Sequence, residues 1–74
     1  MITIRVCAEE NGRPIKNTRV ALGFDGLLRG VADDKWTDGS GEAHFDCSTG
    51  KGQVFVSGQA VYHGQLAGRV VVYV

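Results

Sequence analysis

The chain has 74 residues, 43% of them hydrophobic and 22% charged, and its eight basic and eight acidic residues cancel to a formal net charge of zero. This length gives a single domain, residues 1–74, with a small core, and the composition is that of a folded soluble protein. Because there is no basic excess, we expect neither a nucleic-acid partner nor a membrane partner. No apolar run reaches the length of a membrane span.

Turn-forming residues are abundant, which favours short strands. Eleven glycines and one proline indicate many tight turns. No window repeats apolar residues with the period of a helix. The N-terminus also lacks the pattern of a signal peptide. From the sequence as written we expect a cytoplasmic protein, or an extracellular one if the chain is a piece of a larger secreted protein.

Alternating apolar and polar side chains, the pattern of half-buried strands, recur along the whole chain. The predicted strands cover residues 2–8, 18–24, 31–37, 42–47, 53–57, 59–63 and 66–74. The third is polar enough to lie at a sheet edge, and a turn at Gly64-Gln65 precedes the last. Short strands with a turn signal at each break predict an all-β domain, an antiparallel sandwich.

Residues 36–45 form the stretch around which the rest is organised. Asp38 and Ser40 can hydrogen-bond neighbouring backbone groups, and Gly39 and Gly41 can adopt positive φ without steric cost. Apolar and polar residues alternate after this turn. The stretch therefore predicts a hairpin that joins the third strand to the fourth.

The two cysteines, Cys7 and Cys47, are predicted to be free thiols. Alternation from Ile2 places Cys7 on the outer face of the first strand, whereas alternation from Phe45 places Cys47 on the inner face of the fourth. Side chains on opposite faces of a sheet cannot meet without a bulge. We therefore expect Cys7 to be accessible and Cys47 to be packed.

Three segments carry a resemblance to a known family. Residues 12–22 (GRPIKNTRVAL), 37–45 (TDGSGEAHF) and 53–58 (QVFVSG) are similar to the opening, the hairpin and the following strand of carboxypeptidase regulatory-like, or transthyretin-like, domains. The resemblance implies an immunoglobulin-like or transthyretin-like sandwich of seven strands. It also implies a non-catalytic accessory module, of the kind attached to enzymes, receptors or surface proteins.

A catalytic site built on a thiol is the first alternative. His44, Asp46 and Cys47 are close in sequence, but on a strand His44 and Asp46 project to one face and Cys47 to the other. A nucleophile and its base need direct hydrogen-bond contact. We expect no catalytic residues, although an enzyme using Cys7 or Cys47 with His44 or His63 stays a rival hypothesis.

A calcium site is the second alternative. Asp33, Asp34 and Asp38 offer carboxylates, but Trp36 occupies a position that should ligate, and the distal glutamate of an EF-hand is missing. We therefore expect no metal and no cofactor.

Two aromatic residues, Trp36 and Tyr62, form a candidate ligand platform, because exposed aromatic rings can stack on the faces of sugars. The alternation around Trp36 leaves its face ambiguous. For the single tryptophan of a small domain, a place in the core is the favoured interpretation.

The C-terminal strand is apolar on both faces. Val70, Val72 and Val74 are expected to face the core. The opposite face forms the candidate interface, made of Arg69, Val71 and Tyr73. Monomers seldom expose such a surface, so we expect a homodimer or another protein partner there. The alternative is that Leu27 and Leu28 cover it.

Together these patterns predict a non-catalytic binding or assembly module. A glycan-binding accessory module is the alternative, and a small cysteine-dependent enzyme is a more distant one. The identity of the ligand or partner does not follow from the residues.

Overall fold

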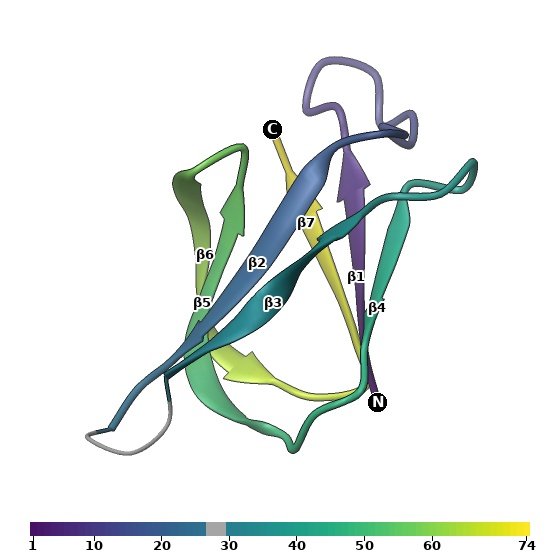
Figure 1. Ribbon diagram of the computed structural model, residues 1–74. Helices are drawn as coiled ribbons and strands as arrows, with labels where there is room; N and C mark the ends of the chain where they lie inside the picture. The colour runs from purple at the N-terminus through teal and green to yellow at the C-terminus, as the bar shows by residue number, and fades with distance from the viewer. Residues whose placement is uncertain (27–29) are drawn as a thin grey trace.

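The computed structural model describes residues 1–26 and 30–74, which form two β-sheets enclosing one core (Figure 1). The strands are β1 (Ile2–Cys7), β2 (Arg19–Phe24), β3 (Gly30–Trp36), β4 (Glu42–Phe45), β5 (Gly50–Val56), β6 (Gln59–Leu66) and β7 (Arg69–Tyr73). None of the described residues is helical, and accordingly no helix there could cross a membrane. The predicted all-β sandwich is confirmed. Leu27 and Leu28 lie outside the described residues.

The two sheets have the strand orders β4-β1-β7 and β3-β2-β5-β6. Every pair is antiparallel except β1 and β7, which run parallel, with Ile4 opposite Val70 and Val6 opposite Val72. The prediction of a wholly antiparallel sandwich is therefore wrong at this pair. The reason is that β1 and β7 come from opposite ends of the chain, so no tight turn obliges them to be antiparallel.

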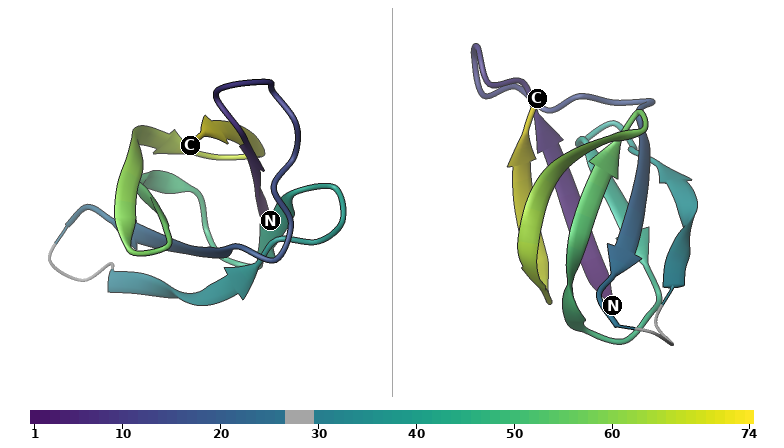
Figure 2. Two further views of the ribbon diagram at one scale, coloured as in Figure 1. Left: turned by 90° about the horizontal axis from the view of Figure 1, so that it is seen from above. Right: turned by 90° about the vertical axis from the view of Figure 1, so that its left-hand side faces the viewer.

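The core lies between the two sheets (Figure 2) and takes buried side chains from β1, β2, β4, β5, β6 and β7. In the smaller sheet Ile2 lies opposite Phe45 and Ile4 opposite Ala43, so strict alternation on β1 buries each inward side chain. The buried cluster consists of Ile2, Ile4, Val6, Val20, Leu22, Ala43, Phe45, Val54, Val56, Leu66, Val70 and Val72. The hydrophobic effect on these side chains is the main stabilising contribution to the fold.

The stretch 36–45 turns as predicted but does not form a hairpin. The Asp38 N–H donates to the Glu42 carbonyl, the Gly41 N–H donates to the Asp38 carbonyl, and Gly41 has φ of 75°. However, β3 belongs to the four-stranded sheet and β4 to the three-stranded one. The turn therefore carries the chain from one sheet to the other, because β4 pairs with β1 and not with β3.

The C-terminal third differs from the prediction at two points. β6 continues through Gly64 and Gln65, where the turn was predicted, to Leu66. The turn into β7 follows and contains Gly68, which has φ of 59°. Val74, expected in the core, is 44% exposed. It lies just after β7, which ends at Tyr73, and it contributes backbone hydrogen bonds and not a buried side chain. Its N–H donates to the Cys7 carbonyl and its carbonyl accepts from the Glu9 N–H.

Both cysteines are free, as predicted, but their accessibilities are reversed. Cys7 does leave β1 on the face opposite Val6, yet it is only 4% exposed. The loop after β1 folds back over this end of the strand, where the backbones of Cys7 and Pro14 form an isolated antiparallel β-bridge. Cys47 is half-buried and packs against the core.

Candidate functional site

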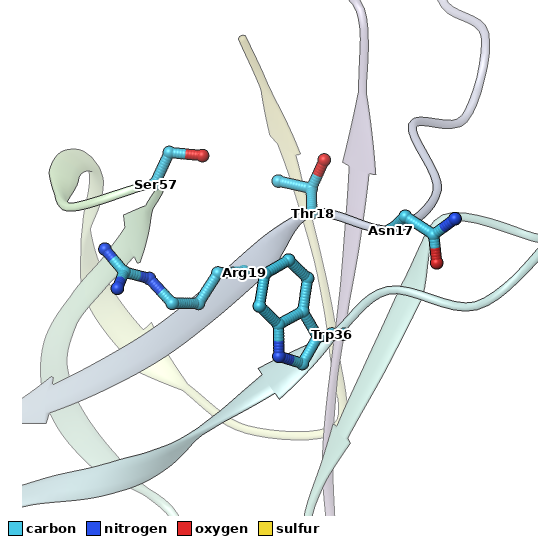
Figure 3. Close-up of a pocket in the computed structure, with 5 residues that line it drawn as sticks. All are labelled: Asn17, Thr18, Arg19, Trp36 and Ser57. Atoms are coloured by element: carbon cyan, nitrogen blue, oxygen red, sulfur yellow. The ribbon is translucent and has the colours of Figure 1, made fainter.

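A shallow hollow of about 230 Å³ opens beside Trp36 on the outer face of the four-stranded sheet (Figure 3). Its lining consists of Asn17, Thr18, Arg19, Trp36 and Ser57. Every one of these residues except the tryptophan offers a polar side chain. The hollow thus combines one large aromatic surface with several hydrogen-bonding groups.

The Trp36 side chain is exposed, which overturns the expectation that it lies in the core: 65% of its surface is accessible. Trp36 pairs with Arg19, whose neighbour Val20 faces the core, so the register places Trp36 outward. A bulge between Val20 and Leu22 shifts the phase of the pairing with β3. The face of Trp36 could not be read from alternation because that shift is invisible in the sequence.

Thr37, the next residue, fixes the wall of the hollow. It is 3% exposed, and its hydroxyl donates to the Ile15 carbonyl at 2.7 Å and accepts from the Thr18 N–H at 2.9 Å. Its own N–H donates to the Thr18 carbonyl, and its carbonyl accepts from the Asn17 N–H. Four hydrogen bonds therefore hold the segment before β2 against the end of β3.

Two non-glycine residues in the described chain have positive φ, and both line the hollow. Asn17 has φ of 55° and Ser57 has φ of 51°. Asparagine tolerates this conformation, but serine rarely adopts it. Ser57 forms the β5–β6 turn with Gly58, at φ of 85°, where Asn-Gly is the usual pair. Backbone strain of this kind concentrates at functional sites.

Arg19 spans the floor between Trp36 and the Ser57 turn. Its carbonyl accepts from the Ser57 N–H at 3.0 Å, and its Nη2 would lie 3.5 Å from a Cβ placed on Gly58. Its Nε is 3.7 Å from Asp34 Oδ2, and both side chains are about half exposed. That ion pair is weak, so the guanidinium has donors to offer a ligand.

Tyr62, the other half of the predicted aromatic platform, lies elsewhere. It is on β6, at the edge of the sheet opposite β3, with β2 and β5 between them. Its ring is partly buried against the core, and its hydroxyl donates to the Gln65 carbonyl. The structure therefore does not bring Trp36 and Tyr62 together, and of these two rings only Trp36 is free to stack on a ligand.

A second polar group lies at the turn before β4. One ligand atom each of Asp38, Glu42 and His44 lie within 4.8 Å of one another. His44 Nε2 is 3.8 Å from Asp38 Oδ2 and 3.9 Å from Glu42 Oε1, while its Nδ1 is 2.9 Å from the Thr3 hydroxyl. Arg69 contacts the other oxygen of Glu42 at 2.7 Å. Among the residues that the structure describes, these three could hold a metal.

Protein groups already contact two of these carboxylates. Backbone N–H groups of Glu42 and Ser40 donate to Asp38 Oδ1 and lower the pKa of that carboxyl from its ordinary value of 3.8. Arg69 compensates Glu42 directly. This group was not predicted from the sequence, although the signal was there: Glu42 and His44 are two residues apart, on one face of a strand, and follow the turn residue Asp38.

The thiols and histidines do not meet in a nucleophile–base arrangement. Cys47 packs against the core, whereas both ring nitrogens of His44 face Thr3, Asp38 and Glu42. His63 Nε2 is 3.2 Å from Asp25 Oδ2.

The candidate interface has the predicted facing. Val71 is 40% and Tyr73 55% exposed, Arg69 lies beside them on the outer face of β7, and Val70 and Val72 are buried. This surface belongs to the smaller sheet, so it is separate from the Trp36 hollow.

Comparison of the chain with protein-family models, with curated proteins and with solved structures finds no match in any of the three.

Proposed function

We propose that this chain is a non-catalytic binding module and that its ligand is a carbohydrate held against Trp36. The observation that carries the proposal is the exposed indole beside a hollow with polar walls. Burying a large aromatic surface on binding releases water, and it is this contact that would provide most of the affinity.

The lining residues suit a sugar. The C–H groups on one face of a pyranose ring pack against an indole, and its hydroxyls both donate and accept hydrogen bonds. Asn17 offers a donor and an acceptor, Ser57 a hydroxyl, and Arg19 several donors. A hollow this shallow fits one or two rings at the surface, in contrast to the enclosing cleft typical of small-molecule sites.

The backbone of the hollow is fixed before any ligand arrives. Thr37 ties Asn17 and Thr18 to the end of β3, and the Ser57 turn is tied to Arg19. Such preorganisation lowers the entropy cost of binding. The strain at Ser57 supports the same view, because an unstrained residue would serve a purely structural turn better.

The resemblance to carboxypeptidase regulatory-like domains supports an accessory rather than a catalytic role. We therefore infer that the chain supplies affinity for a glycan to whatever protein or assembly it serves. An enzymatic use of Cys47 with His44 is disfavoured because the two side chains face different surroundings.

Tryptophan fluorescence tests the proposal, because Trp36 is the sole tryptophan. We expect a saturable change in intensity or emission maximum with at least one member of a panel of neutral and acidic oligosaccharides. Affinity electrophoresis with the same glycan then compares Trp36→Ala with Tyr73→Ala, an exposed aromatic on the other sheet. Loss of retardation only for Trp36→Ala supports the site. Equal behaviour of both variants, or no response across the panel, contradicts the proposal.

A further inference from the structure

β7 has one unpaired edge. In the described part of the chain it pairs with β1 and with no other strand. The Thr3 N–H donates to the Gly68 carbonyl, and the Val74 N–H donates to the Cys7 carbonyl. Because backbone groups alternate sides along a strand, residues 68, 70, 72 and 74 face β1. The N–H and C=O groups of residues 69, 71 and 73 therefore point away from the sheet.

Apart from Arg69, the exposed side chains of this edge are apolar. Val71, Tyr73 and the following Val74 are 40%, 55% and 44% exposed. By contrast, β6, the preceding strand and an edge strand of the other sheet, exposes polar residues such as Gln59 and Gln65. An exposed apolar edge is a template for another strand unless it is protected by charge or proline.

We propose that the β7 edge pairs with β7 of a second copy of this chain, antiparallel and with the two-fold axis at Val71. A two-fold axis lets one edge serve both subunits and closes the assembly at a dimer. The three-stranded sheet would then continue across the axis into the sheet of the partner.

This register satisfies every free backbone group of the strand. With Val71 opposite the partner's Val71, Arg69 lies opposite the partner's Tyr73, and the relation repeats across the axis. Residues 69, 71 and 73 all present their N–H and C=O groups to the edge, so each pair exchanges two hydrogen bonds. A register shifted by one residue would set free groups against groups already bonded to β1.

The side chains also match in this register. Arg69, Val71 and Tyr73 lie on one face of β7, so across the axis the guanidinium of Arg69 meets the ring of the partner's Tyr73. Cation–π contacts and cross-strand pairs of this kind are favourable. Within one copy the Arg69 guanidinium contacts Glu42 of β4, across β1 and away from the free edge, so it turns from Glu42 to reach the partner's ring. The zero net charge adds little repulsion between the copies.

Sedimentation equilibrium at protein concentrations between about 10 μM and 1 mM tests the association. This range suits the weak affinity expected of an interface as small as one strand pair. We expect the wild type to move from monomer to dimer, and Val71→Lys/Tyr73→Lys to raise the dissociation constant at least tenfold. Val71→Pro should do the same while remaining folded, because the N–H that it removes faces away from β1. The matched control, Gln59→Lys/Gln65→Lys, adds the same charge to β6 and should dimerise like the wild type.

Cysteine crosslinking tests the register. In the antiparallel register the two residues 71 lie about 5.5 Å apart at Cα, within the range that a disulfide spans. Val71→Cys in a Cys47→Ser background should form a covalent dimer on mild oxidation, and Gln65→Cys in the same background should not.

Three results would overturn the proposal. The first is a wild type that stays monomeric at 1 mM, which would leave the edge to a different partner. The second is a dimer that survives Val71→Pro and Val71→Lys/Tyr73→Lys. The third is equal crosslinking through residues 71 and 65. Sugar binding at Trp36, on the other sheet, is unaffected by each of these outcomes.

Discussion

Thr18 and Thr37 hold each other through two hydrogen bonds: the Thr18 N–H donates to Thr37 Oγ1 at 2.9 Å, and the Thr37 N–H donates to the Thr18 carbonyl at 2.9 Å. The pair joins the first residue before β2 to the first residue after β3. Because Asn17 and Trp36 flank the two threonines, this link sets the spacing of the polar wall and the indole. The hollow is therefore a product of the sheet register.

Replacing Thr37 tests this link. Thr37→Val keeps the shape of the side chain but leaves the part-buried Thr18 N–H and the Ile15 carbonyl without a partner. We expect the free energy of unfolding to fall by about 1–3 kcal/mol, together with a weaker affinity at the hollow. Urea denaturation measures the first effect. Thr37→Ser, which keeps the hydroxyl, should lose clearly less, and equal losses would argue against the hydrogen bonds.

Gly41 is the second position under strict constraint. A Cβ there would lie 2.7 Å from Pro14 Cβ and 2.8 Å from the Val6 carbonyl oxygen, and its φ of 75° is itself unfavourable for other residues. Gly41→Ala should therefore cost roughly 1–3 kcal/mol or more in urea denaturation. Gly39→Ala, where a Cβ meets nothing, is the matched control and should stay within about 0.5 kcal/mol. Similar losses for both would mean that the turn tolerates either residue.

Ser57 should show a trade-off between stability and binding. Ser57→Asn creates the Asn-Gly pair that suits this turn, so we expect thermal unfolding to show a gain of about 0.5–1 kcal/mol as the strain is relieved. If the hydroxyl contacts the sugar, the same variant binds more weakly. A variant that is neither more stable nor weaker in binding would assign Ser57 no special role.

The Asp38 turn should make stability dependent on pH in the acid range. Hydrogen bonds from the Glu42 and Ser40 N–H groups hold the pKa of Asp38 below its ordinary value of 3.8. The contribution of the carboxylate is thus fully present above pH 3.8 and is lost as the pH falls through the lower, folded-state value. Melting temperatures of the wild type should exceed those of Asp38→Asn at pH 5, and the difference should shrink towards pH 2. A constant difference would mean that ionisation of Asp38 plays no part.

Local patterns predicted the strands well, because alternation and turn chemistry depend on near neighbours. The facing of Ile4 and Phe45, the turn at Asp38 and Gly41, and the outward Val71 all follow from such rules. These predictions were correct because each of these residues has the conformation and facing that its neighbours in sequence favour.

Features that depend on distant pairing could not be read in this way. The parallel contact of β1 with β7 and the departure of β4 into another sheet are decided by partners far along the chain. Cys7 is buried by a returning loop, and Trp36 is exposed through a bulge in the register with β2. For the same reason the candidate hollow was not predicted: Trp36 was named as a candidate, but the core was its favoured place, and its polar neighbours come from separate connections.

The most direct test of the Trp36 site is an amide and indole NMR titration with the best-binding oligosaccharide. Trp36 gives a single indole N–H signal because it is the only tryptophan. We predict that this signal and the amides of Asn17, Thr18 and Ser57 shift together and saturate, while those of Val71 and Tyr73 stay in place. Saturating shifts that spare Trp36 and cluster elsewhere, or an absence of shifts at millimolar sugar, would contradict the account.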